Sequence, residues 1–340
     1  MIRRACWGAA FAVAAAAALL PLPAPAVERL YSRGLFPPLQ RLLTSVSNLV
    51  PFALFDALWI AAVAALAVFA TRRVAERGWG RGLVAVAGLL GRAAVLVYLV
   101  FLAAWGLNYR RLPLSEKVVF DPARVTRAAQ TALGDWAVGE LNRQYASAHA
   151  SAPDLEALRT AFQDALHALG DADIVPGRPK PTLLGWYFHK ASIAGMTDPF
   201  LLETMLAPDL LDVERPFVTA HEWAHLAGYA DESEANFVAY LACRRGDATA
   251  RYSAALVMLG YAPPRRAISD TLDVGPRMDL FAIQNRYAHT SETLRFAARE
   301  GYDRYLKANR VERGVESYDA VVQLILGTEL DAHGNPRLRP

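Results

Sequence analysis

Three apolar runs separated by charged or proline-rich segments occupy the first third of the chain. They cover about residues 6–22, 52–71 and 88–107, and a run of about 20 apolar residues is long enough to cross a bilayer as a helix. From Asn108 onward apolar and polar residues alternate as in a soluble domain. The pattern predicts a membrane domain over residues 1–107, with three transmembrane helices, and a second domain over residues 108–340.

The first run has two interpretations. It is either a signal peptide cleaved near Ala24-Pro25-Ala26 or a retained helix, and the apolar runs that follow favour the retained helix. The arginine-rich segment 72–81 marks the cytoplasmic side. We therefore expect a multi-pass protein of the cell inner (cytoplasmic) membrane, in contact with the lipid bilayer, whose second domain is extracytoplasmic.

The second domain is predicted to be mainly α, with a small β element. Apolar residues at helical spacing predict helices over residues 122–144, 154–169, 234–245, 249–259, 279–287, 291–306 and 317–326. The only strand candidates are residues 182–188 and 192–196, which are short, apolar and aromatic. Residues 331–340 read as a loose tail.

Composition excludes some classes of function. The net charge of the 340 residues is only +3, and no basic stripe interleaved with aromatic residues is present, so no nucleic-acid partner is expected. The two cysteines, Cys6 and Cys243, lie in apolar or helical runs without a partner at ligand spacing. We expect both to be free.

The strongest chemical signal is His221-Glu222-Trp223-Ala224-His225, an H-E-x-x-H pattern. Residues four apart share one face of a helix, so the two imidazoles converge as ligands for zinc. Glu222 lies beside that face, where a carboxylate can act as general base toward water. Pro216 marks the start of this helix and Gly228 its end.

A third zinc ligand is sought in the acidic run that follows, where Asp231, Glu232 and Glu234 compete. Asp231 would fit a pattern similar to that of metzincins. However, Asp231 and Glu234 have the spacing of a capping box, which gives both a structural role. Glu232 then points elsewhere, with Asn236 four residues on and on the same face, where it can hold a ligand. We assign the metal site to His221, His225 and Glu232.

Several stretches together indicate a family. They are residues 27–32, residues 105–110, the H-E-x-A-H-x-x-G-x-A-x-E-x-E-A-N-F match over 221–237, and residues 302–307 and 314–318. The chain resembles the bacterial membrane proteins of domain-of-unknown-function family 3810, which are zincin-like. The resemblance implies three N-terminal spans and a helical zinc-peptidase-like domain. Residues 194–200 depart from the more hydrophobic segment that the family carries before its motif.

These features predict a membrane-anchored zinc metallopeptidase that cleaves a peptide or protein substrate, with Glu222 as general base. Residues 182–196 are the expected groove for an extended substrate. Tyr318, Tyr305 and Tyr302 are the candidates to stabilise an oxyanion, and Tyr318 is preferred. Two alternatives stay open: a non-catalytic scaffold with a structural zinc, and a zinc amidase that acts on a cell-wall bond.

Overall fold

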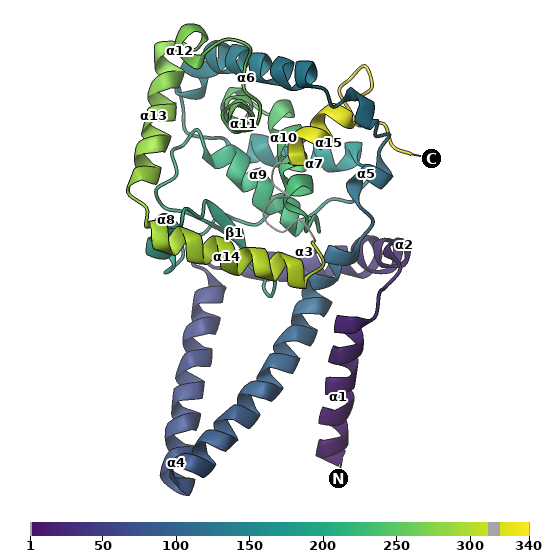
Figure 1. Ribbon diagram of the computed structural model, residues 1–340, viewed down its shortest axis with the longest axis vertical. Helices are drawn as coiled ribbons and strands as arrows, with labels where there is room; N and C mark the ends of the chain where they lie inside the picture. Colours follow the sequence, from purple (N-terminus) through teal and green to yellow (C-terminus); the bar gives the residue numbers. More distant parts are fainter. Residues whose placement is uncertain (1, 312–319, 340) are drawn as a thin grey trace.

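The computed structural model describes residues 2–311 and 320–339, and it is mainly helical (Figure 1). Its first part contains five helical elements in chain order. They are α1 (Ile2–Leu19), α2 (Ala24–Val27), the π-helical η1 (Glu28–Leu35), α3 (Phe36–Ser47) and α4 (Leu54–Ala104).

The second part is a helical domain with one small sheet. Its short elements are η2 (Gly106–Arg110), α5 (Leu114–Lys117), η3 (Pro122–Arg124), α8 (Gly185–Ala191), β1 (Gly195–Thr197), β2 (Thr204–Leu206), α12 (Ile268–Thr271) and α15 (Val321–Gly327). Its longer helices are α6 (Arg127–Ala148), α7 (Leu155–Ala168), α9 (Arg215–Leu226), α10 (Glu232–Arg245), α11 (Ala248–Tyr261), α13 (Val274–Ala288) and α14 (Glu292–Ala308).

The predicted bundle of three separate transmembrane helices needs correction. In the described residues only α4 is long and apolar enough to cross a membrane, and the apolar part of α1, Cys6–Leu19, is shorter. The second and third predicted spans both belong to α4, and the arginine-rich segment between them is helical rather than a loop. Gly78, with φ of 75°, interrupts the helix, and Figure 1 shows two arms of α4 that meet far from the domain. Only glycine adopts such a conformation at low cost.

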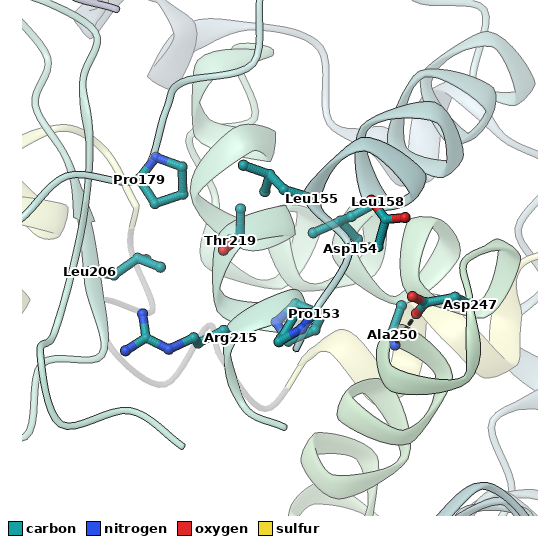
Figure 2. A pocket seen from close by; sticks show the side chains of 11 residues that line it. Pro153, Asp154, Leu155, Leu158, Pro179, Leu206, Arg215, Thr219, Asp247 and Ala250 are labelled. Carbon is teal, nitrogen blue, oxygen red and sulfur yellow. Dashed lines mark hydrogen bonds between the residues drawn. The ribbon is translucent and has the colours of Figure 1, made fainter. Parts of the chain in front are cut away.

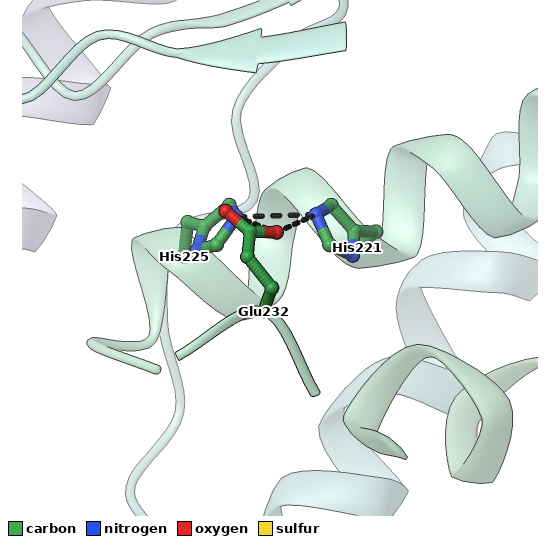
Figure 3. Close-up of side chains that lie close together, drawn as sticks. All are labelled: His221, His225 and Glu232. Carbon is green, nitrogen blue, oxygen red and sulfur yellow. Dashed lines mark hydrogen bonds and ion pairs between the residues drawn. The ribbon is translucent and has the colours of Figure 1, made fainter. Parts of the chain in front are cut away.

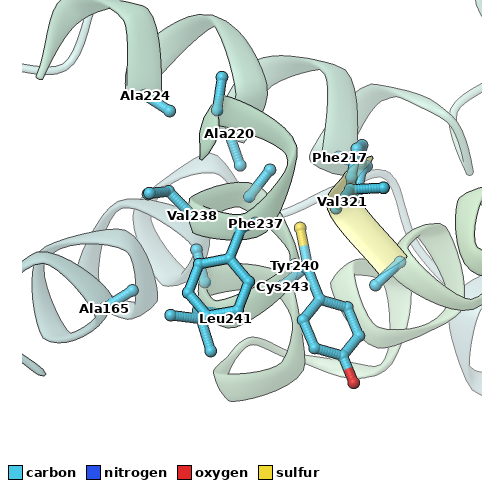
Figure 4. Packing of buried hydrophobic residues seen from close by; sticks show 14 of the residues in the cluster. Ala165, Phe217, Ala220, Ala224, Phe237, Val238, Tyr240, Leu241, Cys243 and Val321 are labelled. Carbon is cyan, nitrogen blue, oxygen red and sulfur yellow. The ribbon is translucent and has the colours of Figure 1, made fainter. Parts of the chain in front are cut away.

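The core of the domain lies around α9 and α10. In α9, Phe217, Ala220 and Ala224 follow each other at three- and four-residue spacing and face α10 (Figure 4). Phe237 and Leu241 of α10 are almost wholly buried in the same cluster. The small alanines let the two helices approach closely, which brings the start of α10 against the end of α9.

A buried carboxylate of the domain fixes the start of α4. Lys180 and Glu203 form a buried ion pair, with 2.5 Å between Lys180 Nζ and Glu203 Oε1. Glu203 also accepts from the backbone N–H groups of Leu54 and Phe55, at 3.0 and 2.8 Å. A carboxylate at a helix N-terminus satisfies N–H groups that have no partner within the helix. The entry of α4 is therefore held by the domain.

Three local predictions were wrong. Residues 185–191 form the helix α8, so the first strand candidate fails and only residues 195–196 of the second lie in a strand. The helix predicted over residues 122–144 is divided in two: Asp121 caps the short η3, and Thr126 caps α6. The C-terminal residues are not a loose tail, because Val118 pairs with Leu338. That pairing is between segments distant in sequence, which local patterns do not reveal.

A small cavity of about 150 Å³ opens where α7, α9 and α11 meet (Figure 2). Its walls include Pro153, Leu155, Leu158 and Thr219, and its only acidic residues are Asp154 and Asp247. Both aspartates are occupied as N-caps, of α7 and α11. Arg215 also lines the cavity, whereas His221 and His225 do not.

Candidate metal centre

The side chains of His221, His225 and Glu232 converge at one point (Figure 3). His221 Nε2 lies 3.1 Å from His225 Nε2 and 3.2 Å from Glu232 Oε2, and His225 Nε2 lies 3.6 Å from the same oxygen. Three ligands about 2.0–2.1 Å from a tetrahedral zinc would stand about 3.3 Å apart. The donor set therefore fits a zinc ion in both chemistry and spacing.

The tautomers of the two histidines are set by their other ring nitrogens. His225 Nδ1 donates to the backbone carbonyl of Tyr229 at 2.7 Å, and His221 Nδ1 donates to Asn236 Oδ1 at 2.9 Å. Both Nε2 atoms then carry lone pairs that face each other and a carboxylate. Such a convergence of acceptors requires a cation or a proton between them. Asn236 thus occupies the supporting position that its spacing predicted.

The electrostatics show the same demand for positive charge. Burial alone would lower the pKa of His225, but the Glu232 carboxylate overrides it and raises this pKa to about 9. Burial would raise the pKa of Glu232, and the two histidines instead hold it well below its usual range. Glu232 is almost wholly buried. A buried carboxylate of this kind is stable only with a cationic partner.

The chain between α9 and α10 turns tightly enough to bring Glu232 back over the histidines. Gly228 has φ of 84°, and a Cβ there would lie 3.0 Å from Asn108 Oδ1. Asp231 caps α10 by accepting from the backbone N–H groups of Ser233 and Glu234. The predicted cap is therefore confirmed for Asp231, and Glu232 is the first residue of α10.

The second half of the predicted capping box was wrong. Glu234 does not reach back to Asp231 but accepts from the backbone N–H of Leu114, at 2.5 Å. Burial, together with the neighbouring Asp231, raises the pKa of Glu234 to about 7. The tertiary contact with α5 replaces the local one, because α10 is buried on this side.

Glu222 lies beside the three converging side chains, against the edge of the sheet. Its Oε2 accepts from Thr197 Oγ1 in β1, at 2.8 Å, and burial raises its pKa despite the opposing effect of His221. A Cβ on Gly195 would lie 2.6 Å from Glu222 Oε1, so β1 approaches this closely only with glycine there. The segment 194–200, singled out as unusual, therefore supplies two contacts to Glu222.

The sheet leaves one edge of β1 without a strand partner in the described part of the chain. β1 pairs antiparallel with β2, Met196 opposite Met205, and on the far side of β2 a bridge joins Met205 to Lys180. The three residues of β1 are half-buried, whereas the residues of β2 are buried. The free edge beside Glu222 is where an extended chain could add as a further strand.

Comparison with family models gave one match, to a model described as a protein of unknown function (DUF3810), over residues 31–326. That range covers most of the chain. The chain belongs to the DUF3810 family. The match confirms the family predicted from the sequence, and it does not bear on the zincin-like character. Comparison of the DUF3810 chain with curated proteins and with solved structures gave no match.

In this DUF3810 chain the three predicted tyrosines have different outcomes. The Tyr302 hydroxyl, on α14, donates to Glu232 Oε1. The Tyr305 ring stacks on that of Tyr302, with centroids 5.8 Å apart. Tyr318, the preferred candidate, lies outside the described residues. Tyr302 therefore contacts the metal-ligand candidate rather than a position open to substrate.

Trp105 is a supporting residue that sequence reasoning placed elsewhere. Its position near the end of the third predicted span, 88–107, is typical of an aromatic belt at a membrane surface, but it is buried, and its indole N–H donates to the backbone carbonyl of His225 at 2.9 Å. The end of α4 thus adjoins α9, the helix that carries the H-E-x-x-H motif. A lone tryptophan at the end of an apolar run carries no signal that distinguishes these two places.

Proposed function

We propose that this protein is a membrane-anchored zinc-dependent hydrolase, most simply a metallopeptidase. His221, His225 and Glu232 would hold the metal. The observation that carries the proposal is the convergence of exactly these three donor atoms, with Glu222 beside them. A structural zinc site normally has four protein ligands, and the described residues supply a group of three. A zinc ion bound there supplies Lewis acidity, which makes water nucleophilic near neutral pH and polarises a carbonyl.

The protein's own residues would divide the remaining work. Glu222 would accept a proton from the attacking water and pass it to the leaving amine. Thr197, which donates to Glu222 Oε2, orients the carboxylate for this transfer. The free edge of β1 would bind the substrate backbone in an extended conformation, which presents a peptide bond next to Glu222.

The two arms of α4 would anchor this centre in the membrane. Each arm has about 25 residues and a length of about 37 Å, which exceeds a hydrocarbon core of about 30 Å. The arginines near the turn at Gly78 would lie in the cytoplasm, which places the metal centre outside it. We propose that α1, whose end contacts the domain, is retained as a third crossing.

The deciding experiment compares the wild-type chain with Glu222→Gln in detergent. Glutamine keeps the shape of the side chain and cannot act as a base, so zinc content should be unchanged and cleavage of a broad peptide library should fall at least about 10²-fold. Glu156→Gln, which changes an exposed glutamate on α7, is the matched control. Equal cleavage by Glu222→Gln and wild type would refute Glu222 as the general base. A wild-type protein purified without zinc would refute the metal site.

A further inference from the structure

The helix α14 lies across the side of the domain from which α4 leaves (Figure 1). At its start, the backbone N–H of Ser291 donates to the Lys190 carbonyl at the end of α8. α8 is itself tied to the first turns of α4, because Asp56 accepts from the backbone N–H of Leu183 at 2.7 Å. Just beyond the other end, Arg310 donates to the carbonyls of Ala18, in the last turn of α1, and of Leu20, directly after it. The segment of α14 therefore links the end of α1 to the start of α4, the latter through α8.

The outward surface of α14 combines an aromatic ring with unpaired positive charge. Phe296 is 71% exposed, and Arg295 and Arg299 on either side of it are exposed as well. Arg304 and Lys307 pair within the helix, with Glu300 and Asp303, whereas no ion-pair partner of Arg295 or Arg299 lies in the part of the chain that the structure describes. Helices at a membrane surface have this composition, since the apolar group enters the lipid and the cations meet anionic headgroups.

Neighbouring elements continue this apolar surface. On the turn into α8 and within it, Leu183 and Trp186 are 75% and 67% exposed. On α3 the exposed Leu42 and Val46 are four residues apart and share one face, and the exposed Leu49 follows just beyond the end of the helix. α3 and the turn into α8 adjoin the start of α4, whose apolar surface is what a bilayer would cover. Their exposed side chains therefore lie where the lipid interface would be.

Two tyrosines in the second half of α14 contact the metal centre and α4. The Tyr302 hydroxyl donates to Glu232 Oε1, and Tyr305 packs edge-on against Phe101 near the end of α4, with centroids 6.1 Å apart. Phe296 lies nine residues before Tyr305 and so about half a turn away from it, which puts the helix between this ring and the converging ligands, whereas Arg295 lies about two turns before Tyr302 on nearly the same face. A helix with its side chains is about 10–12 Å across, which an extended chain crosses in about three to four residues.

We propose that α14 lies in the headgroup region of an anionic bilayer and that the centre it covers cleaves polypeptides anchored in that same membrane, a few residues outside it. The statement about cleavage rests on the proposed function, and the statement about α14 does not. A substrate tethered in the bilayer would reach the free edge of β1 directly. A soluble chain would have to enter between the domain and the lipid.

The position of α14 is tested in the full chain reconstituted in nanodiscs that contain phosphatidylglycerol. A fluorophore is placed at residue 296 by Phe296→Cys, in a background that carries Cys6→Ala and Cys243→Ala. Nitroxide-labelled headgroups should quench it strongly. A fluorophore placed by Val274→Cys, also at an exposed apolar residue but at the start of α13, is the control and should not be quenched. Equal quenching at both positions, or protection of residue 296 by a partner protein, would overturn the inference.

The substrate class is tested with one peptide sequence in two forms, free or attached to a transmembrane segment in the same nanodisc. We expect faster cleavage of the tethered form, and Arg295→Glu/Arg299→Glu should reduce its advantage about tenfold or more, since each basic residue contributes about 1 kcal/mol of attraction to an anionic surface. The control is Arg124→Glu/Arg127→Glu, which changes exposed arginines at the end of η3 and the start of α6. Equal cleavage of both forms would refute the substrate class and leave the hydrolase intact. Cleavage of neither would refute the hydrolase, while the quenching result would stand.

Discussion

Asn236 offers a sharp test of the metal centre, because it touches a ligand without being one. Its Oδ1 accepts from His221 Nδ1 at 2.9 Å, and its side chain is buried. The change Asn236→Leu keeps the volume and removes the acceptor. In the metal-free protein the ring can move its proton to Nε2, where Glu232 Oε2 lies 3.2 Å away. When a metal binds Nε2 the proton cannot move there, so it stays on Nδ1 without a hydrogen-bond acceptor.

The whole cost of the unsatisfied donor therefore falls on the metal-bound state. A buried donor without a partner costs about 1–3 kcal/mol, and about 1.4 kcal/mol is a factor of ten. Zinc affinity should fall about 5- to 150-fold, which agrees with the effect usual for such supporting residues. Asn236→Asp should have the opposite sign, because a carboxylate strengthens the hydrogen bond and because Asn236 Nδ2 has no partner among the described residues.

The assay is competition for zinc against a chromophoric chelator, with the full chain in detergent at constant pH. Asn142→Leu is the matched control. The Asn142 side chain forms hydrogen bonds too, with the backbone of Thr271 and Asp273, but it lies outside the metal centre. It should lose stability and keep its zinc affinity. Wild-type affinity in Asn236→Leu would refute the reasoning, and weaker binding in Asn236→Asp than in wild type would show that the added charge outweighs the hydrogen bond.

Three further predictions concern the ligands, the pH dependence and the topology. Glu232→Ala should abolish stoichiometric zinc in metal analysis, whereas Asp231→Ala should mainly lower the free energy of unfolding, by about 1 kcal/mol for a lost cap; the reverse result would transfer the ligand role to Asp231. The raised pKa of Glu234, about 7, means that the folded state binds an extra proton between about pH 4.5 and 7, so stability falls as pH rises through that range. Glu234→Gln should therefore gain thermal stability relative to wild type above pH 7 and not below pH 4.5, and parallel melting curves at all pH values would contradict this. A reporter active only in the cytoplasm, fused after Pro340, should be silent; activity there would reverse the proposed orientation.

Local patterns were sufficient to predict most of the longer helices and the convergence of His221, His225 and Glu232, but not α8 or the contacts between distant segments. The helices around His221 and Glu232 follow from four-residue spacing and from the cap at Asp231, which are both local signals. Glu234 escaped prediction because its partner, Leu114, is 120 residues away and offers only a backbone N–H.

The membrane part shows the same division between local and distant information. Hydropathy identified the apolar stretches in the two arms of α4, but it could not show that the helix continues through the arginines to Gly78. The short strand β1 was missed in part because three residues are too few for an alternating pattern. Its place beside Glu222 depends on Gly195, whose role appears only when the approach of α9 is known.

The contacts at the end of α1 have a consequence for biogenesis. Arg110 and Arg310 hold the carbonyls of Ala17, Ala18 and Leu20, and Arg310 is translated 290 residues after Leu20. These contacts of α1 can therefore form only after the residues up to Arg310 have been made. Removal of α1 during synthesis would deprive Arg310 of the carbonyls of Ala18 and Leu20, and the segment directly after α14 would lose these contacts.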